Sequence, residues 1–417
     1  MARANESTER NIIVIGGSYG GISTAHYLLK HVIPSLPNKN EFKLILISAT
    51  SEVMCRPACP RALISDELLP QDKLFVDIAK VFEQYPKGSF QLLRGTAVEL
   101  NHGKRTVRVE VANGDTEEVP FYTAVIATGA RTHSPLLGYT KDESHLRETW
   151  ATFRKALPSA KRIIVAGGGP TAIETAGELG EYLNGRAGMF SSKLENPKVQ
   201  ITVVSGAAKV LPQLRDSIAQ TAESYLAQVG VTVLKGSRVA SISPESAGTT
   251  DVSSSCEVTL ADGKVLTTDL YIPAYGTTPN SSFMSPTLLE PDSRIKTNPK
   301  TLRIDQAGPR IYAIGDVASY ARPAVHHILE AVPVLGANIK RDLLLDNGGE
   351  KDVAPADREF KVDTRETQMV PIGTTKGVGA AMGYRLPSLL VWLIKGRDYW
   401  LWTTGNLWSG KQWAKEK

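Results

Sequence analysis

The stretch RIIVAGGGPTAIETAGEL, Arg162–Leu179, decides the fold of this chain. It joins a short apolar run to a cluster of glycines and then to a run of helical composition. This order is typical of a buried parallel strand that turns sharply into a helix. The same order occurs near the start of the chain, where NIIVI (Asn11–Ile15) precedes the loop GGSYGG and a helix predicted from Ile22 to about His31. Two such stretches in one chain indicate an internal duplication.

Each copy continues into a second apolar strand, KLILIS (Lys43–Ser48) in the first and VQITVVS (Val199–Ser205) in the second. A polar stretch with alternating apolar residues follows in each copy, at Thr106–Val119 and at Cys256–Asp269. These stretches predict β-meanders, with tight turns such as the Asn113-Gly114 pair. Each meander leads to one more apolar strand that ends on a glycine turn.

The predicted fold class is therefore α/β, with two Rossmann-like dinucleotide-binding domains and a small C-terminal α+β domain. We expect a discontinuous first domain at 11–130 and 281–345, a second domain at 131–280, and a Trp-rich C-terminal domain at 346–417.

The two glycine loops carry the predicted chemistry. The free N–H groups and the positive dipole end of a helix N-terminus bind a pyrophosphate. The first loop reads Gly16-x-Ser18-x-x-Gly21, with Ser18 where the usual pattern has glycine, and the second reads Gly167-x-Gly169-x-x-Ala172. Glycine turns also occur as plain structure, but the surrounding strands and helices favour dinucleotide binding.

The ends of the second strands should select the nucleotides, because an acidic residue there bonds a ribose and an arginine accommodates a 2′-phosphate. Ser48 occupies this position in the first copy; its hydroxyl can make one such bond, and Glu52 is an alternative source of the acid. Ser205 occupies it in the second copy, and Lys209 is the nearest cation. The choice between NADH and NADPH therefore stays open.

Composition excludes several classes of protein. Hydrophobic residues make up 42% and charged residues 22% of the 417 positions, which is typical of globular chains. A net charge of +5 is too small to indicate a nucleic-acid partner. Three cysteines favour a reducing compartment. The first residues lack a secretory or mitochondrial pattern, Ala2 excludes myristoylation, and no apolar run is long enough to span a membrane, so we expect a cytoplasmic protein.

The order of the motifs resembles that of the pyridine-nucleotide disulfide oxidoreductase superfamily, which has the glutathione-reductase-like two-dinucleotide fold. The motifs are the two glycine loops, the turns Ala127–Gly129 and Gly276–Asn280, and the strand that ends at Asp316. GGSYGG, GGGPTAIETAGEL, YGTTPNSSF and LPSLLVWLIKGRDY are similar to the apoptosis-inducing-factor-like group, especially its AMID-type fungal members. The resemblance implies an FAD-dependent NAD(P)H oxidoreductase that passes electrons to a quinone-like or other small acceptor. The alternative is a redox-sensing flavoprotein module with little turnover.

The resemblance also implies roles for single residues. Asp316 would bond the ribityl chain of FAD, and Arg61 would pair with Glu174 close to the flavin. His326 or His327 could give a proton to a reduced quinone, or both could be ordinary helix residues. The other residues expected to bind the cofactors are Gly16, Ser18, Tyr19, Gly20, Gly21, Ser48, Arg56, Arg61, Ala97, Ala127, Thr128, Gly129, Gly167, Gly169, Pro170, Thr171, Ser205, Gly276 and Val317. No metal site is expected.

Two further features leave alternatives open. Cys55 and Cys59 have the wrong spacing for a redox-active pair, so they are either small apolar fillers or, at Cys59, the reactive thiol of a peroxidase or disulfide reductase. Five of the six tryptophans lie in the last part of the chain, beside the apolar run Leu386–Ile394 and several cations. This segment could contact a membrane surface, such as the mitochondrial outer face or a lipid droplet, pack on the core, or form the surface of a homodimer rather than a monomer.

Overall fold

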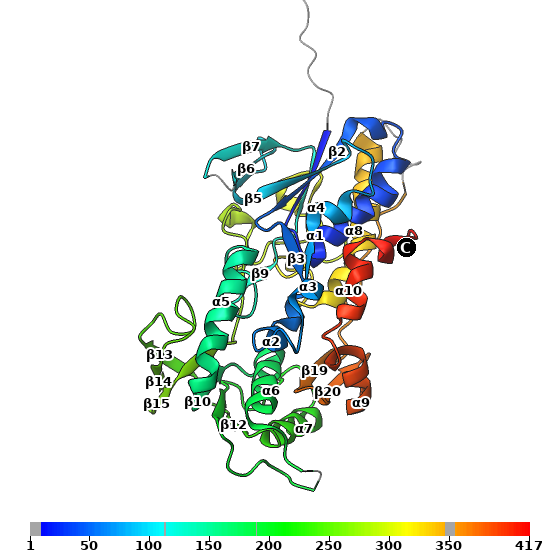
Figure 1. Cartoon of the computed structure of the whole chain (residues 1–417). Helices are drawn as coiled ribbons and strands as arrows, with labels where there is room; N and C mark the ends of the chain where they lie inside the picture. The colour runs from blue at the N-terminus through cyan, green and yellow to red at the C-terminus, as the bar shows by residue number, and fades with distance from the viewer. Residues whose placement is uncertain (1–9, 112–113, 189, 347–354) are drawn as a thin grey trace, which may run out of the picture.

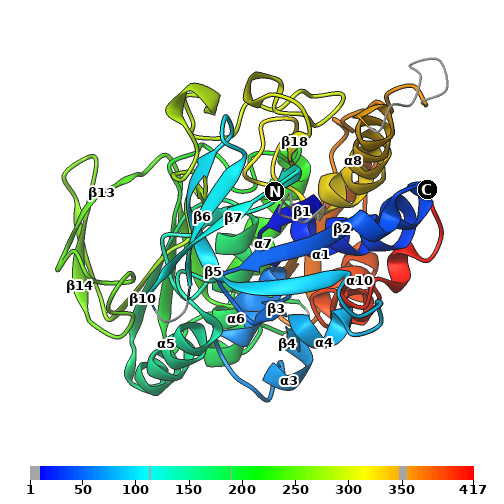
Figure 2. The same ribbon diagram turned by 90° about the horizontal axis from the view of Figure 1, so that it is seen from above.

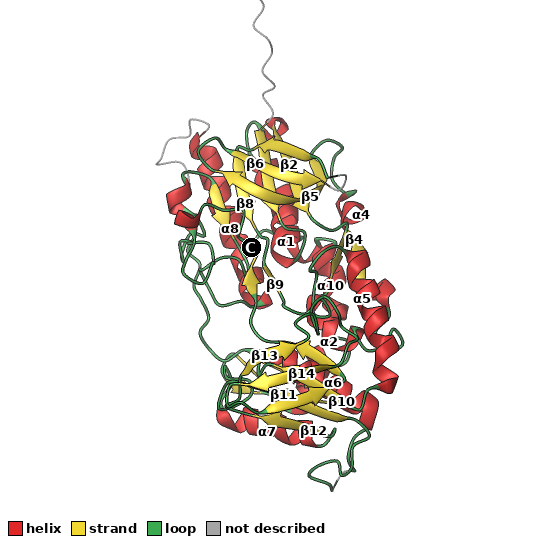
Figure 3. Ribbon diagram, turned by 90° about the vertical axis from the view of Figure 1, so that its left-hand side faces the viewer, coloured by secondary structure: helices red, strands yellow, loops and turns green. Residues whose placement is uncertain are grey.

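The computed structural model describes residues 10–111, 114–188, 190–346 and 355–417. The expectations placed on residues 1–9 and on Asn113 lie outside this part of the chain. Figure 1 shows two α/β units, one above the other, with the C-terminal segment along one side of both. Figure 3 shows the sheet of each unit and the loops that join them. The predicted α/β class with two Rossmann-like sheets is confirmed.

The first unit is built on a seven-stranded sheet in which β18, β8, β1, β2 and β5 run parallel and β5, β6 and β7 form an antiparallel meander. Its parallel strands are apolar because they are buried: Ile12, Ile13 and Val14 of β1 have no exposed surface. The strands in sheet order are β18 (Ile311–Ala313), β8 (Thr123–Ile126), β1 (Arg10–Ile15), β2 (Phe42–Ser48), β5 (Phe90–Asn101), β6 (Thr106–Val111) and β7 (Thr116–Pro120).

Two long helical segments pack together beside this sheet, as Figure 2 shows from above. They are α1 (Tyr19–Tyr27), which continues as a π-helix to Val32, and α8 (Val325–Asp346). The smaller elements between β2 and β5 are β3 (Glu52–Met54), α2 (Cys59–Ala62), α3 (Gln71–Leu74), β4 (Phe75–Asp77) and α4 (Ile78–Phe82).

The second unit has a four-stranded parallel sheet in the order β12-β11-β10-β16. A three-stranded antiparallel sheet stands beside it, and the short pair β9 and β17 links the two units. The strands are β9 (Ala130–Arg131), β10 (Arg162–Ala166), β11 (Gln200–Val204), β12 (Val231–Leu234), β13 (Val239–Ser243), β14 (Cys256–Leu260), β15 (Val265–Thr268), β16 (Leu270–Pro273) and β17 (Thr278–Pro279). The helices are α5 (Glu143–Ala156), α6 (Pro170–Asn184) and α7 (Asp216–Ala227).

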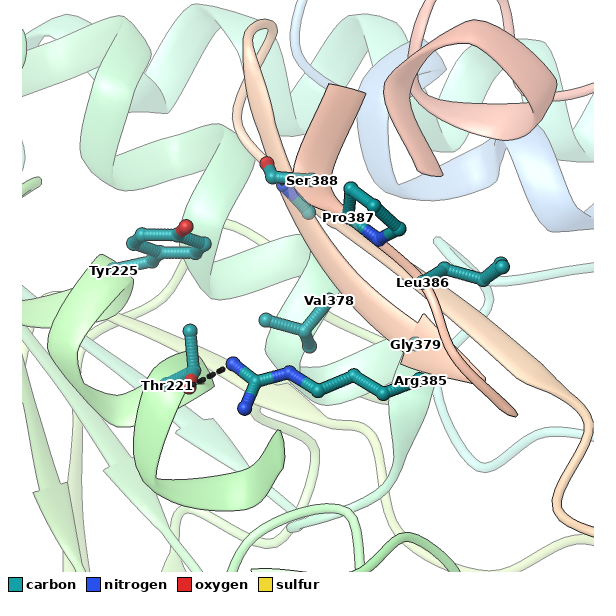
Figure 4. Close-up of a pocket in the computed structure, with 9 residues that line it drawn as sticks. Thr221, Tyr225, Val378, Gly379, Arg385, Leu386, Pro387 and Ser388 are labelled. Carbon is teal, nitrogen blue, oxygen red and sulfur yellow. Dashed lines mark hydrogen bonds between the residues drawn. The ribbon is translucent and has the colours of Figure 1, made fainter. Parts of the chain in front are cut away.

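The C-terminal segment packs on both units and shares their cores. Val370 and Tyr399 belong to the core of the second unit, whereas Trp408 and Trp413 belong to that of the first. Figure 4 shows the segment against α7, where Arg385 Nη2 donates to Thr221 Oγ1 (2.9 Å) beside a small pocket. Its elements are β19 (Gln368–Ile372), β20 (Lys376–Ala381), β21 (Tyr384–Arg385), α9 (Ser388–Val391), a π-helix (Trp392–Gly396) and α10 (Leu401–Trp408).

The tail holds its last tryptophans inside the molecule. Trp408 meets the ring of Tyr19 edge to face at 4.8 Å, and three side chains of the α1 segment bond tail carbonyls. These are His26 to Trp408 O, Lys30 to Gly410 O and His31 to Trp413 O, each at 2.7 Å. The end of the tail around Trp408 and Trp413 therefore packs against the core of the first unit. Among the described residues, no helix is both long and apolar enough to cross a bilayer.

Candidate functional site

The first glycine of each loop is required by close contact with a neighbouring strand. Gly16 has a φ of +122°, and a Cβ atom there would lie 2.3 Å from the carbonyl oxygen of Ala127. Gly167 has a φ of +140°, and a Cβ atom there would lie 2.3 Å from the carbonyl oxygen of Ala274. Because L-residues rarely adopt such φ values, both positions need glycine. The two units therefore make the same turn by the same means.

Sequence reasoning missed the second glycine of each loop. A Cβ atom on Gly17 would lie 2.2 Å from Ser48 Oγ, and one on Gly168 would lie 2.2 Å from Ser205 Oγ. Each loop thus packs against a serine at the end of the second strand of its unit. Ser48 is the last residue of β2, and Ser205 directly follows β11. The signal was available, because both copies have glycine next to the first loop glycine and serine at the same strand position.

The two serines are buried and already have partners. Ser48 is 3% exposed, and its hydroxyl donates to the carbonyl oxygen of Thr50 (2.8 Å). Ser205 is 1% exposed, and its hydroxyl accepts from the N–H of Ala207 (3.3 Å). Because the Ser48 hydroxyl already donates a hydrogen bond to the carbonyl of Thr50 and accepts one from its N–H, its predicted bond to a ribose stays a prediction.

Two carboxylates lie near this end of β2. Glu52, the alternative named above, is paired with Arg147 at 2.6 Å. Glu143, the first residue of α5, is 6% exposed and accepts a short hydrogen bond from Ser51 Oγ. Its Oε1 also lies 3.6 Å from Arg94, which is the register partner of Ser48 on β5. Glu143 Oε2 has no hydrogen-bond partner among the described residues.

The turns after β8 and β16 are bonded to each other beside Asp316. Thr128 Oγ1 donates to the carbonyl of Asn280 (2.7 Å), and Asn280 Nδ2 donates to the carbonyl of Thr128 (2.9 Å). Burial raises the pKa of Asp316, and the Arg56 guanidinium opposes that shift. Arg56 itself donates to the carbonyl of Ala130 (2.6 Å). A half-buried carboxylate that follows Ile314, next to Gly20 at the start of α1, fits a ligand that carries both hydroxyls and phosphates.

The predicted cofactor residues fall into two groups. One lies around the carboxyl ends of the first sheet and comprises Gly16, Ser18, Tyr19, Gly20, Gly21, Ser48, Arg56, Ala97, Ala127, Thr128, Gly129, Asp316 and Val317. The other lies around the carboxyl ends of the second sheet and comprises Gly167, Gly169, Pro170, Thr171, Ser205 and Gly276.

Two buried ion pairs involve glutamates of α6, and they correct the predicted partner of Arg61. Arg61 binds Glu178 through two bonds of 3.0 and 2.8 Å, one helical turn beyond the predicted partner Glu174. The ring of Tyr399 holds Arg61 there by a cation–π contact at 4.8 Å, and its hydroxyl donates to Glu178 (3.0 Å). Glu174 pairs instead with Lys395 of the C-terminal segment at 2.5 Å. The predicted Arg61–Glu174 pair is therefore wrong.

Glu174 is buried and has a raised pKa. Burial raises its pKa to about 7, against the opposing effect of Lys395. The residue lies in the first half of α6, next to the second glycine loop. A carboxyl group that titrates near neutrality in a buried position is typical of acid–base sites.

The cysteines have the environment of packing residues. Cys55 and Cys59 have no exposed surface, and burial raises their pKa values to about 11 and about 12. Tyr19 donates its hydroxyl to Cys55 Sγ (3.3 Å), and Cys55 Sγ donates to the carbonyl of Tyr399 (3.3 Å). Because a thiolate is the reactive form, these pKa values favour the filler interpretation over a reactive Cys59.

The two histidines lie at the start of α8, and His327 lines a cavity of about 460 Å³. His327 has Nδ1 3.0 Å from the carbonyl oxygen of Arg322 and Nε2 3.2 Å from that of Asp363. Burial, the adjacent His327 and Arg322 lower the pKa of His326 to about 4, so its ring is neutral at pH 7. The cavity lies between Gln213 of the second unit and the segment that follows Asp316.

The chain belongs to the pyridine nucleotide-disulphide oxidoreductase family, whose model matches residues 10–334. It is 58% identical over 416 residues to the oxidoreductase phnG of Penicillium herquei, with all of both chains covered. It is 23% identical to apoptosis-inducing factor 1 of Saccharomyces cerevisiae, with 91% of each covered. These relatives confirm the predicted resemblance.

A solved structure shows the same fold. The sulfide:quinone oxidoreductase of Aquifex aeolicus superposes with a TM-score of 0.69 at 14% identity, covering 96% of this chain and 92% of that one. The family fixes the cofactors: this is an FAD- and NAD(P)H-dependent oxidoreductase. The loops, the half-buried Asp316 and the paired turns fit FAD and a nicotinamide nucleotide.

Proposed function

We propose that the reduced flavin of this enzyme passes its electrons to a quinone-like small molecule. The observation that carries this proposal is the Glu174–Lys395 pair, a buried acid–base couple beside the loop for the nicotinamide nucleotide. When bound, FAD supplies the redox chemistry, taking up hydride and releasing electrons. The protein would orient the cofactors, exclude water from the site and hold a proton on Glu174.

We assign FAD to the first unit and NAD(P)H to the second. Gly16–Gly21 and the start of α1 would hold the FAD pyrophosphate, and Asp316 would bond the ribityl hydroxyls. Gly167–Gly169 and the start of α6 would hold the nucleotide pyrophosphate. In both places the N–H groups of a helix start and the positive dipole end attract phosphate.

Glu143 is our candidate for the acid that bonds the adenosine ribose of FAD. Its carboxylate is held at the carboxyl end of β2 by a hydrogen bond from Ser51 and by the nearby charge of Arg94. Glu52, in contrast, is already paired with Arg147. Rotation of the Glu143 carboxylate about its terminal bond exchanges the two oxygens and costs little energy. Glu143 Oε2, which has no partner among the described residues, would accept the hydrogen bond from the ribose, whereas the Ser48 hydroxyl is already engaged with Thr50.

The acceptor would enter through the cavity beside His327. That cavity borders the second unit at Gln213 and the segment Ser319–Arg322, which follows the proposed ribityl-binding residue Asp316. The sulfide:quinone oxidoreductase with the same fold acts on a quinone, which supports this class of acceptor. A surface of Leu389, Leu393 and Trp402, which are 69%, 46% and 56% exposed, supports a peripheral contact with a membrane.

An anaerobic titration followed by an acceptor screen tests the proposal. NADH or NADPH should bleach the flavin absorbance, and quinones should restore it faster than oxygen, ferricyanide or disulfides do. Reoxidation fastest by a disulfide would contradict the proposed acceptor. Slow reduction with a persistent flavin–nicotinamide complex would favour the redox-sensing alternative.

A further inference from the structure

The end of β11 is held against the segment that follows β12. The N–H of Ser205 donates to the carbonyl of Leu234 (2.8 Å), and the N–H of Ser237 donates to the carbonyl of Ser205 (2.9 Å). Gly236 also donates to the carbonyl of Ala207 (3.0 Å). These backbone bonds extend the pairing of the two strands beyond their ends. They fix the position of the next residue, Arg238.

The side chain of Arg238 lies over Gly206. A Cβ atom on Gly206 would lie 2.7 Å from Arg238 Cγ and 3.1 Å from its Nε. A larger residue at this position would therefore displace the side chain of Arg238. Both residues are exposed, so a ligand at the end of β11 can reach the guanidinium.

Arg238 also has an uncompensated charge. Among the described residues, its guanidinium forms no ion pair and no hydrogen bond. The nearby lysines are both engaged: Lys209 bonds Asp216 and the carbonyl of Leu214, each at 2.7 Å, and Lys235 bonds Glu223 at 2.9 Å. Lys209, the nearest cation in the sequence, is thus unsuited to bind a ligand, and Arg238 takes its place.

We propose that Arg238 makes this enzyme selective for NADPH by binding the 2′-phosphate of its adenosine ribose. The inference rests on the proposed placement of NAD(P)H on the second unit. At the end of the second strand an acidic residue would select NADH, and an arginine accommodates the phosphate. Ser205 and Gly206 supply no acid, and a guanidinium binds phosphate through two parallel hydrogen bonds.

The kinetic test compares the holoenzyme with the variant Arg238→Gln and with the matched control Lys235→Gln. Lys235 is a cation on the same segment whose charge Glu223 compensates. We expect the wild type to prefer NADPH. Arg238→Gln should lower kcat/KM for NADPH by about 10- to 100-fold, the size of a lost hydrogen bond to a charged group. The kcat/KM for NADH should change much less. Lys235→Gln should keep the wild-type ratio of kcat/KM for NADPH to kcat/KM for NADH.

A binding test separates this inference from the proposed function. Calorimetry on the holoenzyme measures adenosine 2′,5′-bisphosphate against adenosine 5′-monophosphate at two salt concentrations. The bisphosphate should bind more tightly, with an advantage that salt weakens and Arg238→Gln removes. Equal binding of the two probes, or an equal loss for both nucleotides in the variant, would overturn the inference even if the flavin is reduced. Tighter bisphosphate binding without flavin reduction would support Arg238 and contradict the proposed function.

Discussion

Lys395 and Glu174 form a buried ion pair at 2.5 Å although 221 positions separate them in the chain. The lysine comes from the C-terminal segment and the glutamate from the helix of the second glycine loop. Lys395 also donates to the carbonyl of Met369 (3.1 Å), which fixes its ammonium group. The segment therefore completes the candidate site as well as covering it.

Removing the cation should impair both folding and flavin reduction. Lys395→Met leaves Glu174 buried without its partner, and breaking a buried pair typically costs about 3–5 kcal/mol of the free energy of unfolding. We expect a lower urea midpoint and a slower reduction by NADPH in stopped flow. Lys411→Met, at an exposed lysine of the same segment, is the control. Wild-type stability and rate in Lys395→Met would show that the pair has no such role.

The raised pKa of Glu174 predicts a particular pH dependence of stability. Between its ordinary pKa of 4.5 and the folded value of about 7, the native state binds more protons than the unfolded state. The contribution of Glu174 to the free energy of unfolding should therefore fall as pH rises through this window and level off above it. Glu174→Gln should remove this component, as measured by urea unfolding at several pH values. An identical pH profile in the two proteins would contradict the assignment.

Glu143 and Glu52 offer a matched comparison for FAD binding. Glu143→Gln should weaken FAD about tenfold, because one hydrogen bond between a charged group and a ribose hydroxyl is lost or weakened. Glu52→Gln, whose carboxylate already pairs with Arg147, should bind FAD like the wild type. Fluorescence titration of the reconstituted protein measures both dissociation constants. The reverse order of effects would assign the ribose to Glu52.

The thiols should be inert in the folded protein. Because burial raises the pKa of Cys59 to about 12, we expect negligible alkylation by iodoacetamide at pH 8 until the chain is unfolded in urea. Mass spectrometry of the labelled peptides gives the extent at each cysteine. Cys59→Ala should reduce quinone at a rate close to that of the wild type. Fast labelling of Cys59 together with lost turnover in the variant would restore the thiol-enzyme alternative.

The sequence alone predicted the duplicated glycine loops, the strands next to them and the strand that leads to Asp316. These features are local, because a strand that turns sharply into a helix needs glycine where the chain crosses a neighbouring strand. Apolar parallel strands also reveal themselves by composition. The α/β class and the family therefore follow from the sequence alone.

Only the tertiary structure decided which charged groups meet. Arg61 reaches Glu178 rather than Glu174, Lys395 arrives from the far end of the chain, and Arg238 crosses Gly206. These contacts depend on how the C-terminal segment packs on both units and on how β11 and β12 continue beyond their ends. Residue spacing does not predict such long-range packing, because the energy of an ion pair depends on the distance between the charges in space and not on their separation along the chain.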